Sequence, residues 1–154
     1  MSDTQVAALD HTVQLTNVWL KKLAEEERLG DRPRAYAALR AVLHALRDRL
    51  TPEQAAHFGA QLPLLVRGVF YEGWHMADKP MAVRNVEAFE NMVDRGLPPG
   101  FPVDAATAAR AVFAVIWREL DFNETAKVVS DLPLPLRELW PEAARDLAKA
   151  RSRE

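Results

Sequence analysis

Residues 38–70 read ALRAVLHALRDRLTPEQAAHFGAQLPLLVRGVF, and this stretch decides the fold because the chain contains it twice. Residues 108–140 read AARAVFAVIWRELDFNETAKVVSDLPLPLRELW and align with it without a gap. Self-similarity at a constant offset is typical of repeated structural units, so we predict a tandem duplication. The alternative is two unrelated helical segments with a shared bias toward Ala, Leu and Arg. The identical pairs are Ala38/Ala108, Arg40/Arg110, Ala41/Ala111, Val42/Val112, Leu50/Leu120, Ala56/Ala126, Leu62/Leu132, Pro63/Pro133, Leu64/Leu134 and Arg67/Arg137.

Both copies carry the same signal for the start of a helix. Residues 51–54, TPEQ, predict a capping box in which Thr51 accepts from the backbone three residues on and Gln54 reaches back to the cap. Residues 121–124, DFNE, predict a second capping box from different residue types. Because the two signals fall at matching positions, they support the duplication.

Apolar spacing and helix stops predict an all-α chain, since no segment alternates as a strand does. We expect one domain over residues 1–154, with repeats at about 12–72 and 82–142 and a linker at about 71–80. Short loops favour antiparallel neighbours, so two units of about four helices should share one pseudo-two-fold helical bundle. Residues before Asp10 should form a frayed arm. The expected helices run from Asp10 or Thr12 to Leu29, from Asp31 to Leu50, over 52–61, over 63–70, from residues 78–80 to Gly96, over 104–120, over 122–130, over 133–140, and onward from Pro141.

Composition excludes several classes of function. Cysteine is absent, which excludes disulfides, thiolate metal sites and a cysteine nucleophile. The net charge of −2 argues against nucleic acid or an anionic membrane as a partner. Apolar runs are too short to span a bilayer and the N-terminus lacks a signal-peptide pattern, so we expect a cytoplasmic protein.

Chemistry-bearing residues are few. His44 and His57 have no helical metal-ligand partner, and no nucleophilic triad or phosphate loop is present, so we predict no catalytic residue, metal or cofactor. The repeated arginines Arg40/Arg110 and Arg67/Arg137 are expected to pair with helix carbonyls or carboxylates rather than to form an anion site.

One segment between the repeats gathers varied chemistry around Gly73. Tyr71, Glu72, Trp74 and His75 bring together a phenol, a carboxylate, an indole and an imidazole. Such a loop can bind a small molecule or act as acid and base. The competing interpretation is that Tyr71 and Trp74 seal the seam between the halves.

The run RAYAALRAVLHALRDRLTPEQAAHFGAQLPLLVRGVFYEGW, residues 34–74, closely resembles the bacterial domain-of-unknown-function 2267 family. In the second copy, RAVFAVIWREL and LPLPLRELWP resemble that family's second half, and the resemblance extends over residues 12–141. It implies a small, cytoplasmic, all-helical prokaryotic protein and carries over no catalytic residue. The 71–74 stretch, YEGW, matches the family pattern, whereas His75 does not belong to it.

Two functional hypotheses follow. The first is a non-enzymatic interaction or regulatory module, a helical protein that binds a protein partner or forms a homodimer. Trp117 supports it because it replaces Arg47 off the apolar stripe, where a partner can bury it. The alternative is a small-molecule-binding protein or enzyme that uses the Tyr71–His75 loop.

Overall fold

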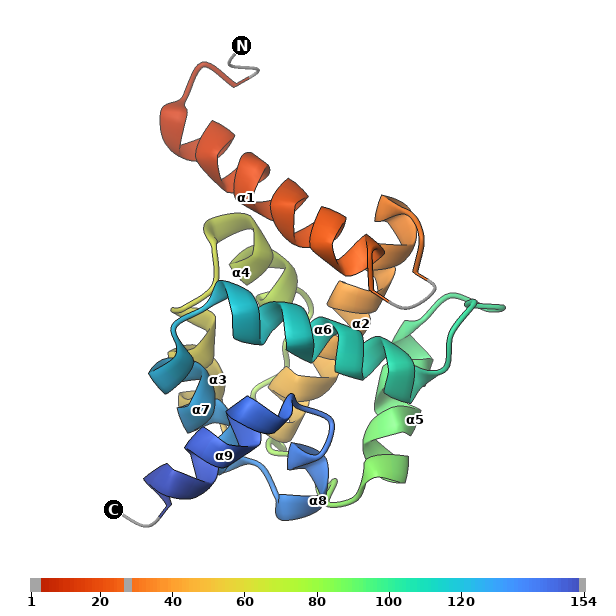
Figure 1. Ribbon diagram of the computed structural model, residues 1–154, viewed down its shortest axis with the longest axis vertical. Helices are drawn as coiled ribbons and strands as arrows, with labels where there is room; N and C mark the ends of the chain where they lie inside the picture. Colours follow the sequence, from red (N-terminus) through yellow and green to blue (C-terminus); the bar gives the residue numbers. More distant parts are fainter. Residues whose placement is uncertain (1–3, 27–28, 153–154) are drawn as a thin grey trace.

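The computed structural model describes residues 4–26 and 29–152, and every regular element in these ranges is a helix. The elements form a bundle in which α2 runs through the centre and α6 crosses it (Figure 1). The predicted all-α class is confirmed. The helices are α1 (Ala7–Ala24), α2 (Arg32–Arg49), α3 (Pro52–Gly59), α4 (Leu64–Tyr71), α5 (Val86–Gly96), α6 (Ala105–Glu119), α7 (Phe122–Asp131), α8 (Leu134–Arg137) and α9 (Glu142–Arg151).

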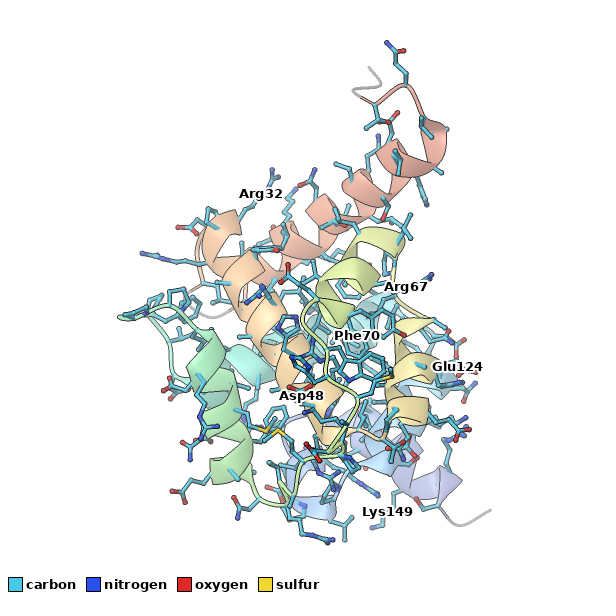
Figure 2. All side chains as sticks on the ribbon, turned by 180° about the vertical axis from the view of Figure 1, so that it is seen from behind. Arg32, Asp48, Arg67, Phe70, Glu124 and Lys149 are labelled. Carbon is cyan, nitrogen blue, oxygen red and sulfur yellow. The ribbon has the colours of Figure 1, made fainter. Side chains whose placement is uncertain are left out.

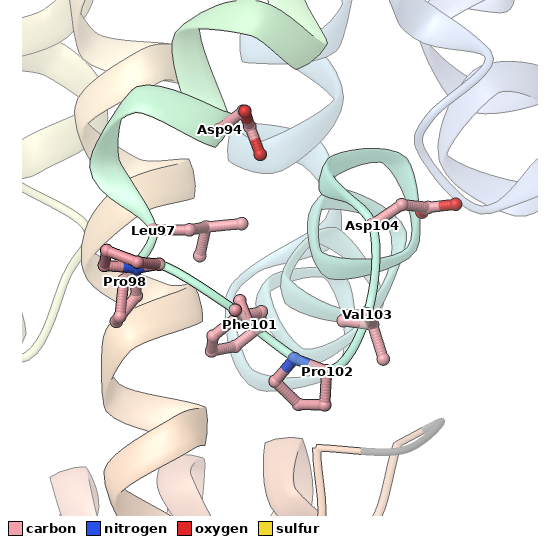
Figure 3. A pocket seen from close by; sticks show the side chains of 9 residues that line it. Asp94, Leu97, Pro98, Phe101, Pro102, Val103 and Asp104 are labelled. Carbon is pink, nitrogen blue, oxygen red and sulfur yellow. The ribbon is translucent and has the colours of Figure 1, made fainter.

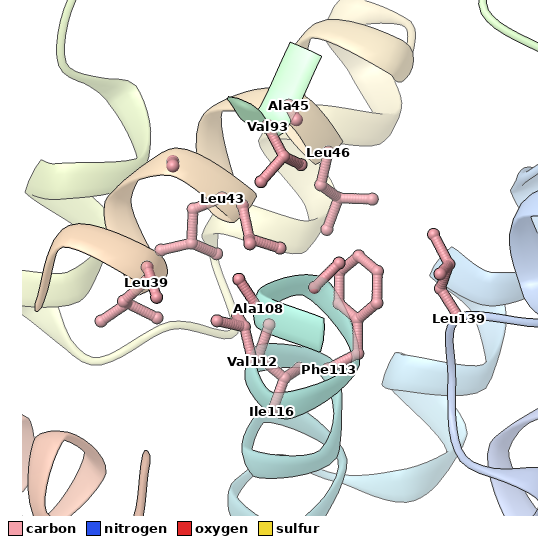
Figure 4. Packing of buried hydrophobic residues seen from close by; sticks show 14 of the residues in the cluster. Leu39, Leu43, Ala45, Leu46, Val93, Ala108, Val112, Phe113, Ile116 and Leu139 are labelled. Carbon is pink, nitrogen blue, oxygen red and sulfur yellow. The ribbon is translucent and has the colours of Figure 1, made fainter. Parts of the chain in front are cut away.

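The core lies between the apolar stripes of α2 and α6, the two helices at the centre of the predicted repeats. Leu39, Leu43 and Leu46 of α2 face Val112 and Ile116 of α6, with further apolar side chains around them (Figure 4). All five are almost completely buried. Burying side chains of this size stabilises a fold by about 1.5–3 kcal/mol each, so this contact contributes substantially to stability.

Side-chain caps fix where most helices begin, as the sequence predicts. Asp31 accepts a hydrogen bond from the Arg34 backbone N–H, and Asp104 does the same for Thr107. The Thr51–Gln54 capping box is present in both directions. These caps are local and therefore readable from the sequence.

The second capping box is only half formed. Asp121 accepts from the backbone N–H of Glu124 as predicted. The carboxylate of Glu124, however, lies 2.7 Å from Nε2 of His57 on α3 instead of returning to the cap. A contact between helices therefore replaces the local one, and it joins the two predicted repeats.

The first helix differs from its prediction at both ends. α1 begins at Ala7, so the expected frayed arm is wrong from that residue onward. It ends at Ala24, before Leu29, although Gly30 has the expected helix-stopping role. Gly30 has a φ of +71°, which favours glycine, and its N–H donates to the carbonyl of Ala24. Residues 27 and 28 of the predicted helix lie outside the described residues.

Two later boundaries are also corrected. α5 begins at Val86, capped by Asn85, and not at residues 78–80. α8 ends at Arg137, and the chain continues to Trp140 in turns, in which the N–H groups of Leu139 and Trp140 donate to the carbonyls three residues earlier.

Matching bonds in the two predicted repeats agree with the duplication, which itself stays a prediction. Arg67 donates to the carbonyls of Leu62 and Ala60, and Arg137 donates to those of Leu132 and Ser130. The partners stand at the same offset as the arginines. Arg110 likewise donates to the carbonyl of Glu138, so the expected pairing of these arginines with helix carbonyls is confirmed.

α1 is anchored along only part of its length. Trp19 and Leu23 pack in the core, and the Thr12 hydroxyl accepts from the backbone N–H of Leu65 at the start of α4. That bond satisfies one of the unpaired donors of α4, which has no side-chain cap of its own. The N-terminal half of α1 projects beyond the rest of the bundle in both whole-molecule views (Figures 1 and 2).

Candidate functional site

The segment after α4 does not hold its four predicted residues together. Tyr71 and Trp74 stack with ring centroids 5.3 Å apart, and both are partly buried against the core. Glu72 and His75 are exposed. The two aromatic residues are placed as expected if they seal the seam between the halves. The role of these residues as a binding loop stays a prediction.

Glu72 is committed to an ion pair with α2. Its carboxylate lies 2.6 Å from the Arg40 guanidinium, and the hydrogen bond from Arg40 lowers the pKa of Glu72. A carboxylate held in its charged form by an arginine is a poor general base at neutral pH. The geometry therefore gives Glu72 the part of a tether between the loop and α2.

The polar side of α2 fastens the end of α4. Arg47 is only 5% exposed and donates to the backbone carbonyls of Phe70 and Glu72. His44 Nε2 lies 2.7 Å from the carbonyl of Val69. These contacts satisfy carbonyls at the helix end that have no partner within α4. We call Arg40, His44 and Arg47 the polar strip of α2; Phe70 and Asp48 mark its position in Figure 2.

Arg40, His44 and Arg47 lie off the apolar stripe of α2, and the sequence did not show that another helix covers them. The available signal was their spacing, because residues 40, 44 and 47 stand four and three positions apart and so share one face of the helix. Charges that face only solvent do not need to be aligned in this way. Buried arginine must be paired, so Arg47 required carbonyl or carboxylate partners. Those partners come from α4 and from Asp48, 2.8 Å away.

Burial in the polar strip lowers the pKa of His44 from its ordinary value of 6.5, and the Arg47 and Arg40 charges lower it further. The unfolded chain therefore binds a proton at His44 at a higher pH than the folded chain does. We expect the free energy of unfolding to fall as the pH drops below about 6.5, until it passes the folded pKa. Urea unfolding at about pH 7.5 and about pH 5.5 measures this loss.

The matched control is the exposed histidine His11. A His44→Gln variant should lose much of the pH dependence in that window, whereas a His11→Gln variant should keep it. Equal pH dependence in wild type and His44→Gln would contradict the assignment.

Trp117 is less exposed than the interaction hypothesis anticipates. It is partly buried, packs against the core, and stacks on Phe122 with centroids 4.5 Å apart. Phe122 is the more exposed partner, at 52%. Any docking through Trp117 would therefore involve Phe122 as well.

One apolar surface was not expected from the sequence. An open hollow of about 560 Å³ lies between α1, α2 and α4. Its walls include Leu9, Tyr36, Leu64, Leu65, Gly68 and Val69, and we call this surface the α1–α4 hollow. The sequence placed Leu64 and Leu65 in an apolar run, but only Val66 and Phe70 of α4 are buried, so the two leucines face outward.

The floor of this hollow is open at Gly68. A Cβ atom added there would meet nothing within 4 Å, so the fold itself leaves room for a side chain. Glycine inside a helix costs about 0.5–1 kcal/mol relative to alanine. Gly68 is therefore an exposed position at which the helix surface carries no side chain.

A second hollow, of about 620 Å³, lies beside the loop between α5 and α6 (Figure 3). Two carboxylates, Asp94 and Asp104, and the prolines of the loop line it. Asp104 is occupied as the cap of α6, and the hydrogen bonds from Thr107 lower its pKa. Within the described residues there is no group of three or more His, Asp or Glu side chains that could hold a metal ion.

No helix among the described residues has the length and apolar character needed to cross a bilayer. A family model described as Uncharacterized conserved protein (DUF2267) matches residues 16–139. A search of curated proteins finds no match.

Proposed function

The chain belongs to the DUF2267 family of uncharacterized conserved proteins, and we propose from its surface that it is a helical protein-interaction module that docks through the α1–α4 hollow. The observation that carries this proposal is the apolar hollow with the unfilled floor at Gly68. Helices that bind other helices present such grooves to an amphipathic partner.

The distribution of exposed apolar side chains supports this location. Among the described residues, ten large hydrophobic side chains are exposed, and four of them line the hollow. Single exposed hydrophobic residues are ordinary, but a gathered set marks an interaction site. The four are Leu9, Tyr36, Leu64 and Leu65, each between 41% and 55% exposed.

The face is also built on firm supports. α4 is fixed to α1 by the Thr12–Leu65 hydrogen bond and to α2 by Arg47 and His44. A binding surface on packed helices keeps its shape without a partner, which reduces the entropy lost on docking. The polar strip therefore supports the docking surface from beneath.

Photo-cross-linking tests the proposal. Because the chain has no cysteine, a label attached to one introduced cysteine sits at that position alone. A Leu65→Cys variant carrying a benzophenone label should form a defined adduct with a protein partner in extract of the source cells. The matched control is Leu134→Cys, because Leu134 corresponds to Leu64 in the second repeat and is 72% exposed. This control should not form that adduct.

Filling the floor of the hollow should abolish the adduct without harming the fold. A Gly68→Leu change adds an apolar side chain where there is space, and Gly68→Ala should raise the free energy of unfolding by about 0.5–1 kcal/mol. If the Leu65 adduct persists when Gly68 is leucine, or if Leu134 gives the same adduct, the proposed surface is wrong.

A further inference from the structure

The two halves of α1 are attached to the bundle by different kinds of side chain. In the second half, Trp19 and Leu23 are buried in the core. In the first half, from Ala7 to Thr16, the buried side chains are those of Thr12 and Thr16. Burial of a large apolar side chain stabilises a fold, whereas a buried hydroxyl must first lose its water. The second half therefore holds α1 to the bundle more strongly than the first half does.

Ion pairs fix the second half of α1 further. Lys22 pairs with Glu119 of α6, and Arg118 of the same helix pairs with Glu26, which follows the end of α1. Exposed pairs contribute little singly. Here both pairs join the same end of α1 to consecutive residues of α6, so they add to the hold of the buried side chains.

The first half of α1 is tied to the bundle by a hydrogen bond. The Thr12 hydroxyl accepts from the backbone N–H of Leu65 at a distance of 2.9 Å. That N–H lies in the first turn of α4, where a helix offers it no acceptor of its own. Apolar side chains of this half, such as Leu9 and Val13, are exposed and gain little from docking. The Thr12–Leu65 bond is therefore the contact on which the closed position of this half depends.

The two halves meet at Thr16. Its hydroxyl donates to the backbone carbonyl of Thr12 at 2.8 Å, within the helix itself. A threonine bond to the carbonyl four residues earlier slightly destabilises a helix and often bends it. Helices shorter than about 12–15 residues are also marginal once they lose tertiary contacts. If the first half leaves the bundle, it should therefore unwind as far as Thr16 and not beyond.

We infer that the first half of α1, residues 7–16, is a hinged segment that Thr12 fastens to α4 and that opens from the bundle while the second half stays docked. The closed position is the one in Figure 1, and the open position is a minor state in exchange with it. Opening removes Leu9 and Thr12 from the wall of the α1–α4 hollow, so the segment controls the shape of that surface. The inference concerns the free chain and does not depend on a partner that docks there.

Amide hydrogen exchange of the full chain, measured by NMR, tests the inference. The Leu65 amide reports the opening directly, because its acceptor is the Thr12 hydroxyl. In wild type, after correction for the intrinsic rates, the amides of Leu65 and of residues 10–16 should exchange on the order of tenfold or more faster than those of residues 19–24. This comparison does not depend on any substitution being well folded.

Three substitutions separate the Thr12 bond from general loosening of α1. Thr12→Val removes the hydroxyl and keeps the branched shape, so it should speed exchange at Leu65 and residues 10–16 on the order of tenfold and leave residues 19–24 unchanged. Thr12→Ser keeps the hydroxyl and should exchange close to wild type. Thr16→Val is the matched control, because the Thr16 hydroxyl bonds within α1, and it should not speed exchange at Leu65.

Equal protection of the two halves of α1 in wild type would overturn the inference. So would a Thr12→Val chain whose Leu65 amide exchanges as slowly as in wild type. If Thr12→Val speeds exchange equally in residues 10–16 and 19–24, then α1 opens as one unit and the hinge at Thr16 is wrong.

Discussion

Replacing Arg47 with alanine is expected to lower the free energy of unfolding by about 3–5 kcal/mol, the range for breaking a buried ion pair by removing one partner. The change removes hydrogen bonds to the carbonyls of Phe70 and Glu72 and the contact with Asp48. It leaves carbonyls at the end of α4 without a partner in a region shielded from water. Urea unfolding measures the loss directly.

Arg40→Ala is the control for this prediction, because Arg40 lies on the same strip but its side chain is 41% exposed. An exposed ion pair contributes about 0–1 kcal/mol, so the loss should be small. A loss at Arg47 no greater than at Arg40 would show that the strip does not hold α4 in place.

Replacing Phe113 with alanine is the other change expected to have a large effect. It should lower the free energy of unfolding by about 3–5 kcal/mol. Phe113 is buried on α6, stacked on Trp140 with centroids 4.1 Å apart and tilted against Phe89 at 6.1 Å. Its removal leaves a cavity among rings contributed by α5, α6 and the segment after α8. Thermal and urea unfolding should both report the loss.

Phe122→Ala is the matched change, since Phe122 contacts Trp117 but is half exposed. This change should lower the free energy of unfolding by less than about 1 kcal/mol. Comparable losses at the two positions would contradict the placement of the core between α2 and α6.

Local signals explain how much of this fold could be predicted from the sequence. Asp31, Thr51, Asp104 and Asp121 each begin a helix by bonding a backbone N–H three residues later, and such a bond depends only on neighbours in sequence. The expected all-α class follows from the same kind of local pattern, whereas the family was expected from the resemblance of residues 34–74 and is shown by the family-model match over residues 16–139. The end of α8 differs from the prediction, because the chain passes from the α-helix into turns at Arg137 rather than at Trp140.

The candidate site was harder to predict because its properties arise from packing. Leu64 and Leu65 belong to an apolar run that looks like core, and only the docking of Val66 and Phe70 turns them outward. Trp117 was chosen by its position off the apolar stripe, yet it packs against the core beside Phe122.

The Tyr71–His75 loop remains the alternative site. One feature keeps it of interest, since Nε1 of Trp74 is buried and has no hydrogen-bond partner among the described residues. An indole N–H usually finds a partner when buried. Binding of a metabolite that is lost in a Trp74→Ala, His75→Ala double variant would favour this alternative.

Hydrogen exchange tests the central claim, that docking takes place on the α1–α4 hollow, most directly. The exchange rates of backbone amides should be compared between the protein alone at low concentration and its assembled form. We predict slower exchange in the first half of α1 and in α4 on assembly, with unchanged rates at residues 97–104, and no slowing in a Gly68→Leu variant. Unchanged rates in α1 and α4, or slowing confined to residues 71–75, would contradict the claim.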